Sequence, residues 1–259
     1  MYFGFGKSTL AGFETTISRP ATRIASDSTL VRFDALARSF GIGSKNINLT
    51  MPMSPSRQIF LLSPANCAGK RAGFLLRKDG GSALAQRLRS GEGATIGEVF
   101  TFMSGLYFRG KLAYASVFTN PPDGSAGIQV IVPGLGLRSP DALIDLEGLR
   151  AIARIPVDPG DRRYTRPLRR DAARLAEGLH PSDAAVLLGS IATPKYLEPL
   201  KAVLGPRLRF PREFIGRGDM SRGALMLRCA AERRELTYIE GSEPVHNPTV
   251  DTARDAGFR

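Results

Sequence analysis

Short apolar runs along the chain alternate with longer stretches in which apolar residues recur at helical spacing. Runs such as IFLL and AAVLL are closed by serine, proline or glycine, a pattern typical of strands buried in a sheet. The runs predict strands at 57–64, 127–134, 184–192, 207–210 and 235–240.

Between these runs, apolar residues return every three or four positions, as they do on one face of a helix. The glycine pair at 80–81 breaks the first such stretch, and Gly105 and Gly110 interrupt the stretch at 95–119. One further segment is expected to start as a loop and to become a helix only after Pro167. The remaining helices are predicted at 66–78, 82–91, 193–205 and 219–233.

The alternation of strands and helices predicts an α/β fold, a mostly parallel sheet with helices on both faces in a single domain. We expect this domain to span 53–240. Residues 1–52 are rich in Ser, Thr, Gly and Ala without sustained periodicity. They lack the apolar core of a secretory signal, so we expect a flexible extension or a start site placed too early. Residues 241–259 are expected to form a flexible tail.

The chain carries a large positive charge, with 36 Lys and Arg against 24 Asp and Glu, a net charge of +12. Such a charge favours DNA or a nucleotide-like ligand as partner. No apolar run reaches the roughly 18 residues of a membrane span, so we expect no membrane partner and a cytoplasmic location. The two cysteines and two histidines lack the spacing of a metal site, and no cofactor is expected. The oligomeric state is left open.

Polar loops follow the first three predicted strands: SPANCAGKR, PGLGLRSPD and GSIATPKY. Ligands of open parallel sheets bind beyond the carboxyl ends of the strands, so we expect these loops to converge on one edge. In the first loop, Ser63, Asn66, Lys70 and Arg71 surround the start of a helix. Backbone N–H groups and the helix dipole favour an anion there. The alternative is a plain helix start with exposed basic residues.

Arginines gather in two segments further along the chain. Their planar forks match phosphate geometry, and Tyr164 in the first segment could stack on a base. The second segment opens a helix capped by Asp219 or Ser221, which again suits a phosphate. Two clusters in one basic chain favour a nucleic-acid surface over a merely solvated face. The clusters are Arg162, Arg163, Arg166, Arg169 and Arg170, then Arg207, Arg209, Arg212, Arg217 and Arg222.

Candidate catalytic groups are few. Asp141, Asp145 and Glu147 follow the second predicted strand and Asp219 lies in the second arginine segment, but none of them forms a recognisable acid–base pair by spacing. Cys67 lies near two cations, which could lower its thiol pKa, although a buried and inert cysteine is the commoner outcome.

Four short motifs occur in an order known from one family. RGDMSR at 217–222 is similar to an RGxMSR-type motif that opens a C-terminal helix, and LLSPA at 61–65 is similar to an ISPAKT segment. SIAT at 190–193 with Tyr196 is similar to NLASxEYF, and PGLGL at 133–137 to an SGLYG turn. Together they resemble the YaaA family of peroxide-stress proteins over roughly 58–230. The resemblance implies DNA binding through a basic cleft and a role in limiting oxidative damage.

The chain departs from the family pattern at several of these positions. Asn66 stands where the family has lysine, and Ser190 where it has asparagine. A second resemblance lies at 106–115, where LYFRGKLAYA is similar to a helix of small domains linked to modified nucleobases. Tyr107 would match a tyrosine in either pattern, and Arg109 joins Ser190 among the candidate phosphate- or ligand-binding residues.

Our leading hypothesis is a DNA-binding protein with a basic cleft, lined by Ser63, Asn66, Arg217 and Ser221. The rival is an enzyme of transferase or glycosylase type that acts on a nucleobase or nucleoside in the same cleft. Ser63 and Asn66 would then read a base edge, and Asp219 or Tyr107 would do the chemistry. A third hypothesis is an interaction protein without a small ligand. A deep pocket favours the enzyme, whereas an open groove lined by arginines favours binding alone.

Overall fold

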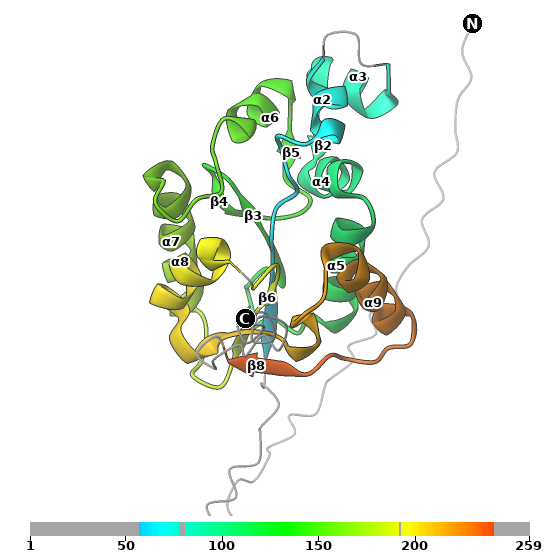
Figure 1. The fold of residues 1–259 in the computed structure, drawn as a ribbon. Helices are drawn as coiled ribbons and strands as arrows, with labels where there is room; N and C mark the ends of the chain where they lie inside the picture. The colour runs from blue at the N-terminus through cyan, green and yellow to red at the C-terminus, as the bar shows by residue number, and fades with distance from the viewer. Residues whose placement is uncertain (1–56, 78–80, 192, 241–259) are drawn as a thin grey trace, which may run out of the picture. The chain divides into compact units, whose positions relative to one another are not determined.

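The computed structural model describes residues 57–77, 81–191 and 193–240. They contain a six-stranded sheet in the order β4-β3-β1-β6-β7-β8 (Figure 1). The flexible extension and tail expected from the sequence lie outside the described residues. The strands are β1 (Gln58–Leu62), β3 (Ile128–Val132), β4 (Gly136–Arg138), β6 (Ala184–Leu188), β7 (Leu208–Pro211) and β8 (Tyr238–Glu240).

The centre of the sheet is parallel. β1 pairs with β3 on one side and with β6 on the other, and β7 continues the parallel order beyond β6. Both faces of β1 and β6 are covered, which is why their sequences are apolar almost throughout and every residue in them is buried. β4 and β8 add antiparallel edges. The predicted α/β class with a mainly parallel sheet is confirmed.

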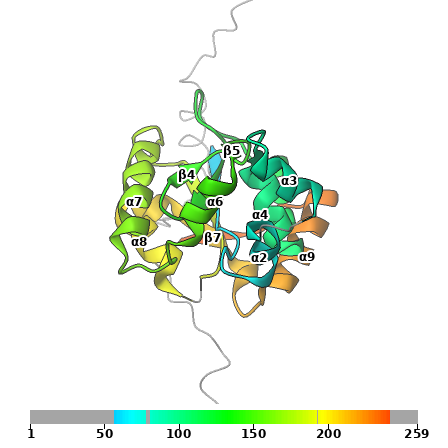
Figure 2. The same ribbon diagram turned by 90° about the horizontal axis from the view of Figure 1, so that it is seen from above.

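Helices cover both faces of this sheet. Side chains alternate along β1, so that Phe60 and Leu62 join one apolar cluster and Ile59 and Leu61 join the other. The first cluster includes α4, α5 and α9, the second α7 and α8, and Figure 2 shows these two groups on opposite sides. The helices are α2 (Lys70–Leu76), α3 (Ala83–Arg89), α4 (Ile96–Ser104), α5 (Leu106–Phe118), α6 (Leu146–Ala153), α7 (Arg162–Glu177), α8 (Pro194–Leu204) and α9 (Asp219–Ala231).

α7 differs from its prediction because Pro167 lies within the helix and not before it. The Asp161 side chain caps the helix by accepting the backbone N–H of Arg163 at 2.8 Å. Tyr164 and Leu168 are buried in the apolar cluster that α7 shares with the sheet. The cap and this packing outweigh the hydrogen bond that proline removes.

The two glycines of the stretch at 95–119 have different roles. Gly105 ends α4 and precedes α5 with a φ of 59°, as expected for a residue that separates two helices. Gly110 lies inside α5, so the interruption predicted there is wrong. A Cβ atom on Gly110 would lie 2.6 Å from the carbonyl oxygen of Gly223 in α9. Gly110 therefore permits two helix backbones to approach closely.

Several short elements were not predicted from the sequence. α6 and the antiparallel strand β4 belong to this group, as does a separate two-stranded sheet of β2 (Ala94–Thr95) and β5 (Leu143–Ile144). The three strands are too short to produce a clear apolar period, whereas α6 has apolar residues at Leu146, Leu149 and Ile152, a helical spacing that was overlooked. None of the helices in the described part of the chain has the length and apolarity that a membrane crossing requires.

Candidate functional site

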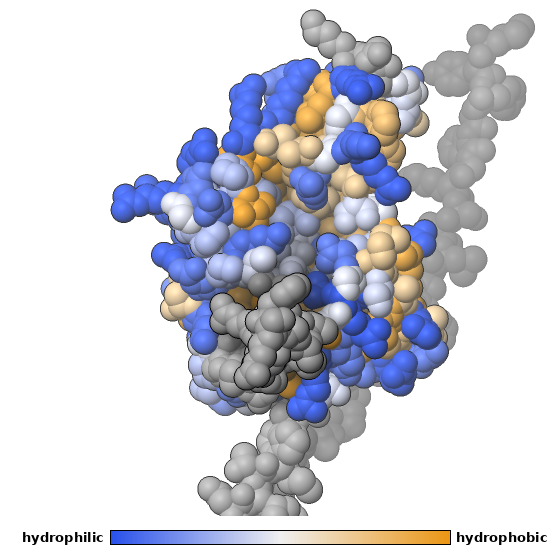
Figure 3. Space-filling view, in the orientation of Figure 1, coloured by the Kyte–Doolittle hydropathy of each residue, from blue (hydrophilic) through white to orange (hydrophobic). Residues whose placement is uncertain are grey.

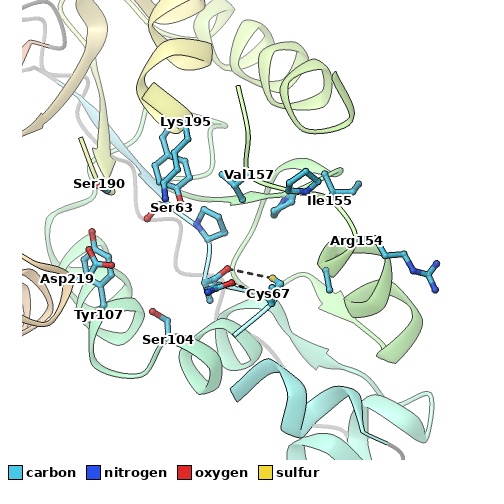
Figure 4. Close-up of a pocket in the computed structure, with 18 residues that line it drawn as sticks. Ser63, Cys67, Ser104, Tyr107, Arg154, Ile155, Val157, Ser190, Lys195 and Asp219 are labelled. Carbon is cyan, nitrogen blue, oxygen red and sulfur yellow. Dashed lines mark hydrogen bonds between the residues drawn. The ribbon is translucent and has the colours of Figure 1, made fainter. Parts of the chain in front are cut away.

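A pocket of about 610 Å³ opens at the carboxyl ends of β1, β3 and β6 (Figure 4). The structure thus brings together the three loops that the sequence placed at one edge of the sheet. A fourth segment, 153–157, begins at the last residue of α6 and also lines the pocket. The lining residues are Ser63 to Ala68, Ser104, Tyr107, Pro133, Ala153 to Val157, Ser190, Lys195, Tyr196 and Asp219.

Ser63 is fixed at the floor of this pocket by the sheet itself. Its backbone N–H donates to the carbonyl of Leu188 at 3.1 Å, which extends the pairing of β1 and β6 by one residue. Its side chain is buried, and a Cβ on Gly189 would lie 3.0 Å from the Ser63 Cβ. Glycine at 189 therefore leaves the space that the serine occupies.

Lys111, on α5, is fully buried beneath the pocket. Its amino group donates to the Ser63 carbonyl oxygen at 2.5 Å and to the Ser63 Oγ at 2.9 Å. The rings of Tyr107 and Phe108 lie 4.5 and 4.9 Å from the same nitrogen. Burial lowers the pKa of Lys111 to about 7, and the charge of Asp219 acts in the opposite direction. Near neutral pH this amine therefore exists in both protonation states.

Tyr107 lies one helical turn before Lys111 and also lines the pocket. Its hydroxyl is buried and has no hydrogen-bond partner among the described residues. Burial, with a smaller effect from Asp219, raises the pKa of Tyr107 to about 12, and the nearby guanidinium of Arg222 acts in the opposite direction. Asp219 and Tyr107 lie beside each other at one end of the pocket in Figure 4. The tyrosine is therefore a protonated hydroxyl that can donate to a ligand.

The motif that opens α9 contributes one residue to the pocket. Asp219 lines it, whereas Arg217 and Ser221 are exposed and not among the lining residues, contrary to the expected cleft. Arg217 instead donates to the Ser221 Oγ at 3.3 Å. Successive residues of a helix turn point in different directions, so the motif cannot direct all its polar groups into one cavity.

Arg222 has a structural role. It is 5 % exposed and donates from Nε at 3.2 Å and from Nη2 at 2.9 Å to the carbonyl oxygen of Phe214. Its Nη1 also pairs with Asp219 at 3.3 Å. The predicted phosphate ligand thus holds the start of α9 against the preceding turn, where it satisfies a buried carbonyl.

The basic residues predicted next to the first loop lie outside the pocket lining. Lys70, Arg71 and Arg109 are exposed. α2 begins after Gly69, without a side-chain cap. Asn66 does line the pocket, and its Oδ1 also accepts the backbone N–H of Ala68 at 3.0 Å.

The arginines of α7 are exposed, and residues of hydrophilic character predominate on the side of the molecule where α7 and α8 lie (Figure 3). Arg163 pairs with Asp161, and Arg170 pairs with Asp171. Arg162, Arg166 and Arg169 complete this cluster. None of the five lines the pocket.

The second predicted arginine cluster is distributed over several roles. Arg207 donates from Nη1 to the carbonyls of Ala176 and Leu179, so it binds the carbonyl end of α7. Arg209 carries a buried Nε without a partner among the described residues. Arg212 is exposed. The cluster therefore supplies no common phosphate site within the pocket.

Sequence reasoning missed Lys111, Ser104, Lys195 and the segment 153–157. One signal for Lys111 was available, because it lies four residues after Tyr107 and so places a charge on the apolar face of the stretch. Lys195 lies in the loop GSIATPKY that was placed at this edge but was not singled out, and Ser104 and the segment 153–157 had no comparable signal.

The remaining reactive groups do not form a second centre here. Burial raises the pKa of the Cys67 thiol to about 12, which argues against a reactive thiolate. Its Sγ donates to the carbonyl of Ala65 at 3.6 Å. Across the described ranges, no cluster of three or more His, Cys, Asp and Glu residues could hold a metal ion.

Comparisons with known families, with curated proteins and with solved structures found no match for this chain. The resemblance to the YaaA family therefore stays a prediction.

Proposed function

We propose that the chain is an enzyme that acts on a molecule of nucleobase or nucleoside size inside this pocket. The observation that carries the proposal is the buried amino group of Lys111, which meets the hydroxyl of pocket-lining Ser63 at 2.9 Å. Burial of a lysine without a carboxylate partner is costly, and groups perturbed in this way concentrate at functional sites. No ion pair to Lys111 occurs among the described residues.

The charge of the pocket supports a small ligand over a nucleic-acid backbone. Among the described lining residues, the cations are Arg154 and Lys195. Arg154 is exposed and extends away from Ser63 in Figure 4. A groove that follows a phosphate backbone needs a row of such charges. A volume of about 610 Å³ falls within the range of small-molecule sites.

The chemistry of the lining suits a heterocycle with polar edges. Asn66 offers an amide and Ser190 a hydroxyl, which are the groups that pair with base edges. Tyr196 adds an aromatic ring. The resemblance of 106–115 to domains linked to modified nucleobases points in the same direction. We therefore propose a nucleobase or nucleoside derivative as the ligand class, and a distant YaaA-like relationship remains part of this proposal.

Thermal unfolding in the presence of nucleobases and nucleosides tests the pocket. A ligand at about 100 times its Kd should stabilise the wild type by about 2.7 kcal/mol. Ser190→Phe should remove that shift by filling the pocket, whereas Ser221→Phe, exposed and outside the lining, should retain it. A shift that survives in Ser190→Phe, or the absence of any shift across the panel, would contradict the proposal.

DNA binding remains a second candidate, at a separate surface on α7. Arg162, Arg166 and Arg169 recur at spacings of four and three residues, so they share one exposed face of the helix. Side chains on one face can contact successive phosphates.

The salt dependence of DNA affinity tests this second candidate. The double variant Arg166→Ala with Arg169→Ala should flatten the slope of log affinity against log salt by about one unit per lost phosphate contact. Arg109→Ala with Arg228→Ala removes the same charge from exposed positions on α5 and α9, and it should leave the slope closer to that of the wild type. Equal slopes for both double variants would exclude α7 as the DNA surface.

A further inference from the structure

We propose that Ser63 is a nucleophile and Lys111 its general base, and that the substrate carries an ester or amide group. The proposal rests on the proposed function, because it takes the pocket as an active site and specifies the reaction as acyl transfer. Two observations carry it independently: the contact of Lys111 with the Ser63 Oγ at 2.9 Å and the unpartnered, buried hydroxyl of Tyr107.

The two contacts of Lys111 divide its roles. One N–H donates to the Ser63 carbonyl oxygen at 2.5 Å and anchors the amino group. The second contact, to Oγ, is the one along which a proton can move. Rings of Tyr107 and Phe108 enclose the nitrogen, and Lys111 has no exposed surface. A neutral amine in this position can accept the serine proton, as the base does in serine–lysine enzymes.

The proposed reaction begins with neutral Lys111. Ser63 Oγ bonds to the acyl carbon while the hydroxyl proton passes to the lysine nitrogen, and the carbonyl oxygen becomes an oxyanion. The bond to the leaving group then breaks, and that group takes the proton from Lys111 and departs as an alcohol or amine. Water attacks the resulting acyl-enzyme, gives a proton to Lys111 and releases the acid as Ser63 regains its hydroxyl. No metal or redox partner enters this balance.

Tyr107 supplies a donor for the oxyanion. Its hydroxyl lacks a partner among the described residues, and its ring adjoins the Lys111 nitrogen. A donor that is unpaired before the substrate binds gains a hydrogen bond when negative charge develops on the substrate oxygen. Asp219 lies at the same end of the pocket, but its side chain is exposed, so it does not form a buried ion pair with Lys111.

Covalent labelling of the full chain with an alkyl fluorophosphonate tests the pair. The serine Oγ–phosphorus bond forms, the phosphorus–fluorine bond breaks, and the serine proton passes to Lys111 as fluoride leaves. We expect one adduct on the peptide that contains Ser63, none in Ser63→Ala, and at least a tenfold slower reaction in Lys111→Met. Ser116→Ala, on the same helix as Lys111 but outside this pocket, should react like the wild type.

The rate of labelling should rise with pH through about 7, because the neutral amine is the reactive form. This profile is measured on the wild type, so it remains decisive even if Lys111→Met fails to fold. An adduct on Ser104 or Ser190, no adduct up to about pH 9, or a rate without this rise would overturn the assignment. Nucleoside binding without labelling would support the proposed ligand class and overturn the assignment of Ser63 and Lys111. Labelling of Ser63 without nucleoside binding would overturn the ligand class and support the assignment of Ser63 and Lys111.

Discussion

Replacement of Lys111 by methionine should change how stability depends on pH. Burial lowers the pKa of Lys111 from 10.5 to about 7. Between these values the unfolded chain holds a proton on Lys111 that the folded chain has released. Unfolding therefore takes up a proton, and the free energy of unfolding of the wild type rises as the pH increases. Methionine fills a similar volume without a titratable group, so Lys111→Met lacks this contribution.

The size of the effect follows from the difference in pKa. One pKa unit corresponds to about 1.4 kcal/mol, and the wild type should gain about 2 kcal/mol relative to Lys111→Met between about pH 7 and pH 9. Below about pH 7 the folded state carries the buried charge, so the variant should be the more stable protein there.

Urea denaturation at a series of pH values measures this difference. The chain has no tryptophan, so circular dichroism or tyrosine fluorescence would follow unfolding. Lys201→Met, which removes one exposed positive charge from α8, is the matched control. A stability difference between wild type and Lys111→Met that stays constant from about pH 7 to pH 9 would refute the lowered pKa and the neutral amine that the proposed chemistry needs.

Three further changes test the packing around the site by the same denaturation assay. Gly110→Ala should cost about 1–3 kcal/mol because its Cβ would meet the Gly223 carbonyl at 2.6 Å, whereas Gly73→Ala, with no atom within 4 Å of the added carbon, should be neutral or stabilising. Similar losses in both glycine variants would contradict the close helix crossing. Thr95→Ala removes the capping box of α4 and should cost about 1 kcal/mol, and no loss would show that the cap contributes nothing. Arg222→Met should cost about 1–3 kcal/mol because the Phe214 carbonyl would keep only the longer hydrogen bond from the backbone N–H of Arg217, and a neutral result would mean that water replaces the guanidinium.

The sheet could be predicted from the sequence because its signal is local. The runs around β1, β3 and β6 are apolar at almost every position, with Gln58 and Gln129 as the exceptions, since helices cover both faces of the sheet centre. Parallel strands place the residues that follow them at one edge, so Ser63, Asn66 and Ser190 could be assigned to a common pocket. The edge strand β4 is too short to show such a signal, and α6 was missed although its apolar residues recur at helical spacing.

The inner part of the site depends on contacts between residues far apart in the sequence. Lys111 and Ser63 are 48 residues apart, and only the packing of α5 on β1 brings the amine beneath the serine. Arg222 likewise resembles a phosphate ligand in the sequence, and the structure gives it the carbonyl of Phe214. A glycine that interrupts a helix and a glycine that lets two helices approach closely look alike in the sequence, so the role of Gly110 could not be predicted. Tertiary contacts determine these roles, and the local sequence pattern gives little indication of them.

The position of Ser63 at the end of β1 separates the rigid and the adaptable parts of the pocket. β1 is hydrogen-bonded to parallel neighbours on both sides, so its amide protons should be among the slowest in the protein to exchange with solvent. The pocket residues at 64–68 and 154–157 belong to connecting segments outside the regular helices and strands, which hold fewer backbone hydrogen bonds. Substitutions in these segments can therefore alter which molecules fit while the serine oxygen keeps its place, so that selectivity and reactivity can change independently.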